Sequence, residues 1–132
     1  MKRAILFLFI LVLSSVAGFA QKKFYVTIAG MGFPDAKTHI LSGSRDDMLS
    51  KPSLAVMPDI GTVVSYQVSY LPKRGEYHGP YEVHGAELTA REKSLTKQGG
   101  YGDQFFFEAI KVQLNDGTKA VVDAPAFFVR IQ

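Results

Sequence analysis

The chain has 132 residues, of which 47% are apolar, and none is cysteine. The absence of cysteine excludes a disulfide framework, thiolate catalysis and the acylated cysteine of a lipoprotein. The formal charge is +3, but Lys2 and Arg3 contribute two of the basic residues, and no long run of lysine or arginine offers a face for phosphates. We therefore expect no nucleic-acid partner.

The first twenty residues have the pattern of a signal peptide. Positive charge in Met1-Lys2-Arg3 precedes an uncharged, strongly apolar run over residues 4–16, and Gly18-Phe19-Ala20 places small residues where a signal peptidase cleaves. We predict a signal peptide over residues 1–20, cleavage after Ala20 and no stable membrane insertion afterwards. The alternative is an uncleaved anchor, since residues 4–20 nearly suffice to cross a bilayer. The expected location is the periplasm, with the extracellular space or the outer membrane as alternatives.

Residues 21–132 are enough for a single domain with one core. A first strand is predicted to place three residues on one face: Phe24, Val26 and Ile28. A second short strand is expected over Thr38–Leu41. Ser44 and Asp47 have the spacing to cap a short helical turn, which Pro52 would stop.

The clearest strand runs from Val63 to Leu71. Polar residues alternate along it with apolar ones, which predicts that four residues face the core: Val64, Tyr66, Val68 and Tyr70. Residues 71–80 should form a loop that leads to a strand near residues 81–84. Thr89 and Glu92 form a capping-box pattern, which predicts a short helix ending at Gly99-Gly100.

The segment Gln104–Leu114 changes phase in its middle. Phe105 and Phe107 share one parity, whereas three later apolar residues share the other: Ile110, Val112 and Leu114. We therefore predict a β-bulge near Glu108-Ala109. Asn115-Asp116-Gly117 predicts a hairpin.

The last strand should place Phe127, Val129 and Ile131 inward, while Pro125 confines its start to an edge or a bend. Taken together, the pattern predicts an all-β fold, namely an immunoglobulin-like β-sandwich of about seven strands with one short helix.

Four short blocks resemble a known family. They are Val64-Ser65-Tyr66-Gln67-Val68, the segment Gly102-Asp103-Gln104-Phe105-Phe106-Phe107-Glu108-Ala109-Ile110-Lys111-Val112, the pair Asp116-Gly117, and Phe127-Phe128-Val129. From about Phe33 onward, the chain is similar to the C-terminal periplasmic domain of the GldM (PorM) family of gliding motility and type IX secretion.

This resemblance implies a periplasmic all-β module that docks onto other envelope proteins, and it implies no catalytic residue. GldM carries a membrane-spanning helix and several periplasmic domains ahead of this one. Here we expect a cleavable leader before a lone domain over residues 21–132, so coupling to an inner-membrane motor does not carry over.

Patterns that would indicate catalysis or a cofactor are missing from the sequence. Gly30 and Gly32 lack the third glycine of a dinucleotide site, because Asp35 stands in its place. The three histidines have no zinc-ligand spacing, and no Gly-x-Ser-x-Gly elbow surrounds a serine. We expect neither an enzyme nor a bound cofactor or metal.

The best candidate for a functional surface is the predicted loop before the strand at residues 81–84. Its tyrosines, arginine and neighbouring basic residues are of the types that anchor protein interfaces: Lys73, Arg74, Tyr77, His78 and Tyr81. An alternative remains open, in which Tyr70 and Tyr81 are half-buried strand residues and Tyr77 alone is free.

Two functional hypotheses follow from these features. The first is a non-catalytic protein–protein interaction module of the bacterial envelope, with type IX secretion components among its expected partners. The alternative is a β-sandwich that binds a glycan or a peptide. Exposed edge strands would also allow pairing with a second copy of the chain.

Overall fold

The computed structural model describes residues 24–132, so the predicted signal peptide lies outside the described residues. Within this part, no helix is long and apolar enough to cross a membrane. The elements in chain order are β1 (Tyr25–Ile28), β2 (Ile40–Gly43), α2 (Arg45–Ser50), β3 (Leu54–Met57), β4 (Gly61–Leu71), β5 (His78–His84), α3 (Ala90–Gln98), β6 (Gln104–Leu114), β7 (Val121–Ala124) and β8 (Phe127–Ile131). The predicted all-β sandwich is confirmed.

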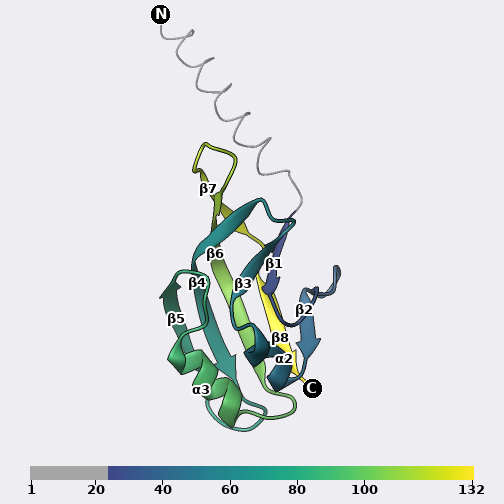
Figure 1. Ribbon diagram of the computed structural model, residues 1–132. Coiled ribbons are helices and arrows are strands. Elements are labelled where there is room, and N and C mark those ends of the chain that lie inside the picture. The colour runs from purple at the N-terminus through teal and green to yellow at the C-terminus, as the bar shows by residue number, and fades with distance from the viewer. Residues whose placement is uncertain (1–23) are drawn as a thin grey trace, which may run out of the picture.

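The strands form one large sheet and one small sheet (Figure 1). The large sheet has six strands, with the order β2-β8-β6-β4-β5 and with β7 paired to β6. β2 runs parallel to β8, and the other pairings are antiparallel. The small sheet is the antiparallel pair of β1 and β3.

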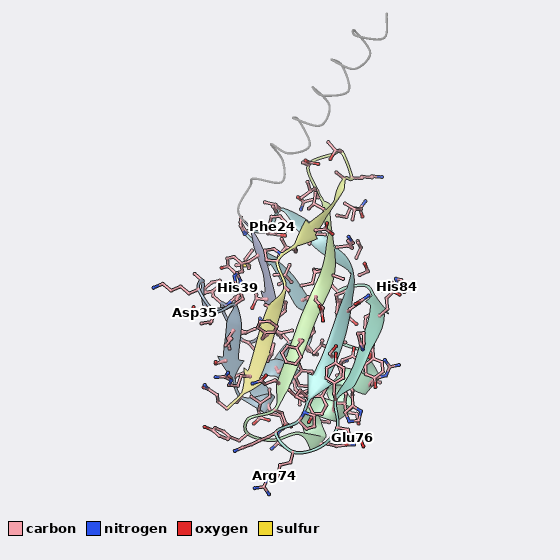
Figure 2. All side chains as sticks on the ribbon, turned by 180° about the vertical axis from the view of Figure 1, so that it is seen from behind. Phe24, Asp35, His39, Arg74, Glu76 and His84 are labelled. Atoms are coloured by element: carbon pink, nitrogen blue, oxygen red, sulfur yellow. The ribbon has the colours of Figure 1, made fainter. Side chains whose placement is uncertain are left out.

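One face of the large sheet is covered by β1, β3 and the two helices (Figure 1). The core lies between these layers and is built around the aromatic side chains of Tyr66, Phe105, Phe107 and Phe127, which are at most 1% exposed. The Phe107 and Phe127 rings stack with their centroids 4.9 Å apart. The other face of the large sheet is covered by no described helix or strand (Figure 2).

The bulge predicted near Glu108-Ala109 is confirmed. Between the register pairs Ser65–Lys111 and Gln67–Glu108, β6 advances by three residues while β4 advances by two. Ala109 takes up the extra residue with a φ of +50°. The insertion brings Ile110 and Val112 onto the same buried face as Phe107.

The prediction for the start of β4 is wrong at one position. A second register shift lies between Val63 and Ser65, so Val63 is 2% exposed and Val64 is only half-buried. This bulge in β4 lies one residue pair before the bulge in β6, and the run Val63-Val64 shows no phase change that would reveal it in the sequence. The predicted core positions Tyr66, Val68 and Tyr70 are confirmed.

β2 begins at Ile40, two residues later than predicted. The carboxylate of Asp35 accepts hydrogen bonds from the backbone N–H groups of Lys37 and Thr38, and His39 has a φ of +57°. These interactions hold the preceding residues in a turn. β3 is a strand that the sequence analysis missed, because Pro52 and Pro58 flank an apolar segment of only four residues.

Both predicted helix starts are confirmed. Ser44 and Asp47 exchange capping-box hydrogen bonds at the start of α2. At the start of α3, the buried Glu92 carboxylate accepts hydrogen bonds from the backbone N–H and the hydroxyl of Thr89. α3 ends at Gln98, directly before the predicted Gly99-Gly100.

The hairpin after β6 joins it to β7, and Pro125 separates β7 from β8. Both β7 and β8 pair with β6, so the predicted hairpin leads into β7, a strand that the sequence analysis missed, and the last strand begins after the bend at Pro125. The inward positions of the last strand, Phe127, Val129 and Ile131, are confirmed.

Candidate functional site

A row of large side chains crosses the uncovered face of the six-stranded sheet. Ser69 of β4 pairs with Phe106 of β6, Phe106 pairs with Phe128 of β8, and Phe128 pairs with Ile40 of β2. Paired residues in a sheet point to the same face. Tyr77 lies over Ser69, and we call Tyr77, Phe106, Phe128 and Ile40 the aromatic row.

The aromatic row is partly open to solvent. Tyr77 is 52% exposed and Phe128 is 38% exposed, whereas Phe106 and Ile40 are half-buried. The Phe106 and Phe128 rings meet edge to face, with centroids 5.1 Å apart and an interplanar angle of 81°. The row therefore presents a ridged apolar surface and not a flat one.

Tyr77 is held on this face by a hydrogen bond. Its hydroxyl lies 2.6 Å from Oγ of Ser69, which is fully buried beneath it. Gly79 permits this approach, because a Cβ at that position would lie 3.0 Å from the carbonyl oxygen of Val68 and 3.1 Å from Cα of Ser69. The sequence of the loop thus places the Tyr77 ring on the sheet and not in free solvent.

A shallow hollow of about 240 Å³ lies beside the aromatic row. It is lined by Ile40, Gln104, Phe106, Phe128, Val129 and Arg130. Lys111 forms an ion pair with Asp123, whereas the Arg130 guanidinium has no acidic partner among residues 24–132. The hollow therefore combines apolar walls with one uncompensated positive charge.

The five residues predicted as an interaction loop do not share one surface. Tyr77 belongs to the aromatic row, and Arg74 is exposed at the end of the sandwich (Figure 2). The ammonium group of Lys73 lies 5.4 Å from the centroid of the Tyr101 ring. These three side chains are exposed, as expected for residues of a loop.

His78 and Tyr81 belong to β5 and face the covered side of the sheet. His78 pairs with Tyr70, and their ring centroids are 5.8 Å apart. Tyr81 pairs with Val68, and the guanidinium of Arg91 on α3 lies 4.0 Å from its ring centroid. Tyr81 is half-buried, which matches the alternative that the sequence analysis left open.

Asp103 fixes the base of the loop that carries Tyr77. Its carboxylate accepts hydrogen bonds from the Tyr70 hydroxyl at 2.6 Å and from the backbone N–H groups of Lys73 and Gly100 at 2.8 Å each. Burial opposes the ionisation of Asp103, but these hydrogen bonds outweigh it and lower the pKa of the carboxyl group. Burial, followed by the interaction with Asp103, raises the pKa of the Tyr70 hydroxyl.

The sequence analysis missed Phe106 and Phe128 as surface residues. Each is the middle residue of three consecutive apolar positions in a strand. Because successive side chains point to opposite faces, one residue of every such triplet must point away from the core. Applied to Phe105-Phe106-Phe107 and Phe127-Phe128-Val129, this rule identifies both residues.

A second apolar hollow, of about 410 Å³, lies between β1 and the turn that follows it. Its walls include Phe24, Phe33 and Pro125, and Asp35 and His39 lie at its margin (Figure 2). The backbone N–H groups of Thr38 and Lys37 bond to the Asp35 carboxylate and lower its pKa. This carboxylate is therefore already engaged by the turn.

Within residues 24–132, no group of three or more His, Cys, Asp and Glu side chains is arranged to hold a metal ion. Every buried side-chain nitrogen and oxygen atom in this part of the chain has a hydrogen-bond partner. The described core therefore holds no polar group that awaits a ligand.

Two sequence comparisons were made, one with protein families and one with curated proteins. No protein-family model matches the chain, and no curated protein matches its sequence.

Proposed function

We propose that the protein is a non-catalytic, exported interaction module of the bacterial envelope that binds a protein partner through the aromatic row. The observation that carries this proposal is the exposure of Tyr77 and Phe128 together on the uncovered face of the large sheet. Exposed aromatic residues beside an arginine are the side chains that most often anchor protein interfaces.

The shape of the row favours a protein partner over a sugar. Sugar rings pack against flat aromatic faces, whereas the Phe106 and Phe128 rings meet at 81°. Their edges and faces form a ridge beside the hollow at Arg130. Such a surface suits an apolar side chain of a partner together with a neighbouring acidic group.

The similarity to the GldM C-terminal domain supports an envelope partner from type IX secretion or gliding motility. The blocks that carry the similarity include Gly102-Asp103 and Phe127-Phe128-Val129. Asp103 holds the loop of Tyr77, and Phe128 lies in the aromatic row. We place the partner among the periplasmic components of that machinery.

Site-specific photo-crosslinking in the native bacterium tests the proposal. A benzophenone amino acid at position 128 should crosslink to an exported protein, whereas the same group at the exposed Val121 on β7 should not. With the partner identified, Phe128→Ser and Tyr77→Ser should each weaken its affinity roughly tenfold, the effect of losing an interface anchor. Val121→Ser serves as the matched control.

Equal crosslinking at positions 128 and 121 would argue against a binding surface on this face. A strain that lacks this protein but secretes and glides normally would rule out the assignment to type IX secretion. The crosslinks at position 128 would still test whether the aromatic row binds a partner. The two parts of the proposal can therefore fail separately.

A further inference from the structure

β5 forms an open edge of the large sheet. It is the last strand in the order β2-β8-β6-β4-β5, and it lies at the outer edge of the sheet in Figure 1. An edge strand presents unpaired backbone N–H and C=O groups that another strand can use. The opposite edge differs, because the carbonyl of Ile40 on β2 already accepts the Asp35 N–H at 2.9 Å.

The groups that point outward from β5 follow from its pairing with β4. The Gly85 N–H donates to the Val64 carbonyl at 2.7 Å, and this pair continues the register of His84 with Ser65. In an antiparallel ladder, hydrogen-bonded and non-hydrogen-bonded pairs alternate. The backbone groups of Glu82 and His84 therefore point away from β4.

The free part of the edge is short and bounded at both ends. Pro80 has no N–H to offer, and the register shifts between Val68 and Tyr70 beside it. Beyond β5, the chain moves to the other layer, where the Ala86 carbonyl accepts the Leu54 N–H at 2.8 Å. The edge therefore offers Glu82, Val83 and His84 to a partner strand.

The side chains of two β5 edges match each other in charge when two copies of the chain are placed side by side. Glu82 and His84 both lie on the uncovered face, are exposed and form no ion pair with residues 24–132. If a second copy pairs antiparallel about a twofold axis at Val83, Glu82 of each copy lies opposite His84 of the other. An acidic group opposite an imidazole favours this register. Registers that place Glu82 opposite Glu82, or His84 opposite His84, are disfavoured because like groups then face each other.

We propose that the β5 edge pairs with the β5 edge of a second copy of this chain, centred on Val83, to join two large sheets into one. Each copy contributes the N–H and C=O groups of Glu82 and His84. The pairing leaves the aromatic row free on both copies, so a dimer would present two partner-binding faces side by side. The inference goes beyond the proposed function and uses a different surface.

Cysteine crosslinking tests the register, because the chain has no cysteine of its own. In the proposed dimer, positions 82 and 84 of opposite copies form a hydrogen-bonded pair, whose Cα atoms lie about 5.5 Å apart, within disulfide range. Positions 82 and 82 are diagonal neighbours at roughly 7–8 Å, beyond that range. Differently tagged full-length Glu82→Cys and His84→Cys proteins should form a mixed disulfide dimer under mild oxidation.

Neither cysteine protein alone should crosslink efficiently. Failure of the mixture to crosslink, or equal crosslinking in each protein alone, would overturn the proposed register. Phe128→Ser placed in both proteins should leave the mixed crosslink unchanged, which separates this result from the outcome for the aromatic row.

A charge exchange supplies a second measurement that does not depend on cysteine. Glu82→His in an otherwise unchanged chain should shift the sedimentation-equilibrium mass toward the monomer, because imidazoles then face each other. The double variant Glu82→His, His84→Glu should restore the dimer, since each pair is re-formed in reverse. Because a folding defect in the single variant would not be repaired by a second substitution, recovery of the dimer would support the pairing. A double variant that remains monomeric would contradict pairing about Val83.

Discussion

At the residue scale, Asp103 links three parts of the molecule. Its carboxylate joins Tyr70 of β4, Lys73 of the following loop and Gly100 after α3. The backbone of Gly99 lies so close to the Asp103 carboxylate that a Cβ on Gly99 would be 2.4 Å from it. A single buried charge thus determines how the loop leaves β4 and how α3 leads into β6.

The lowered pKa of Asp103 predicts a pH-dependent contribution to stability. Its pKa is lower in the folded state than in the unfolded state, so the contribution is present above the unfolded value of about 3.9. It is lost as the pH falls through the folded pKa. We expect Asp103→Asn to lower the free energy of unfolding by about 2 kcal/mol at pH 7, the scale of hydrogen bonds to a charged group.

Urea unfolding at a series of pH values measures this difference. The gap between wild type and Asp103→Asn should narrow as the pH falls below about 4. Asp59→Asn, in an exposed turn, should follow the wild type throughout. A gap that stays constant down to pH 2 would show that the carboxylate is not stabilised in its ionised form.

Tyr77 shows what residue type alone can predict. The presence of an aromatic residue in a loop identified it as a candidate, and its exposure agrees with that reading. Its position over Ser69 depends on Gly79 and on the register of β4, which no local pattern reveals. The residue could be named in advance, but the surface to which it belongs could not.

At the element scale, β6 carries two different surfaces on one strand. Phe105 and Phe107 are fully buried, while Phe106 between them lies in the aromatic row. The same residue type therefore fills the core at two positions and forms the candidate site at the position between them. Only the alternation of the strand separates the core from the candidate site.

Paired substitutions in β6 test this separation. Phe107→Ala removes a ring that stacks on Phe127 and should lower the free energy of unfolding by about 3–5 kcal/mol, as for other buried phenylalanines. Phe106→Ala should cost much less, because its ring already meets solvent at the surface. Guanidinium denaturation measures both, and equal losses would contradict the assigned faces.

At the scale of the whole molecule, one core connects the two sheets and the helices. The cluster of buried residues includes Val26 of β1, Met48 of α2 and Val56 of β3 together with residues of the large sheet. Because the small sheet has only two strands, it depends on this packing for its stability. The layers should therefore unfold together.

We expect Val26→Ala to destabilise the entire protein by about 2 kcal/mol, from lost methyl groups and the cavity that remains. Far-ultraviolet circular dichroism, which reports the strands, and near-ultraviolet circular dichroism, which reports the packing of the aromatic side chains, most of them on the large sheet, should show one shared midpoint. Val121→Ala, on the exposed side of β7, should leave that midpoint in place. Separate midpoints for the two signals would contradict a single cooperative core.

The sequence by itself determined the features that depend on near neighbours in the chain. Capping residues at Ser44 and Thr89 located both helices, alternation located β4 and β6, and the phase change located the bulge at Ala109. Each of these signals acts over a few residues, where backbone geometry and side-chain spacing suffice.

Only the tertiary structure decided which residues meet across strands. The second bulge moved Val63 into the core, and the register aligned Ser69, Phe106, Phe128 and Ile40 in one row. Register depends on packing between segments far apart in the chain, and a shift of one residue would turn every side chain of a strand to the other face. The candidate site is a product of that register: alternation within each strand could mark Phe106 and Phe128 as surface residues, but only the register places them in one row with Tyr77.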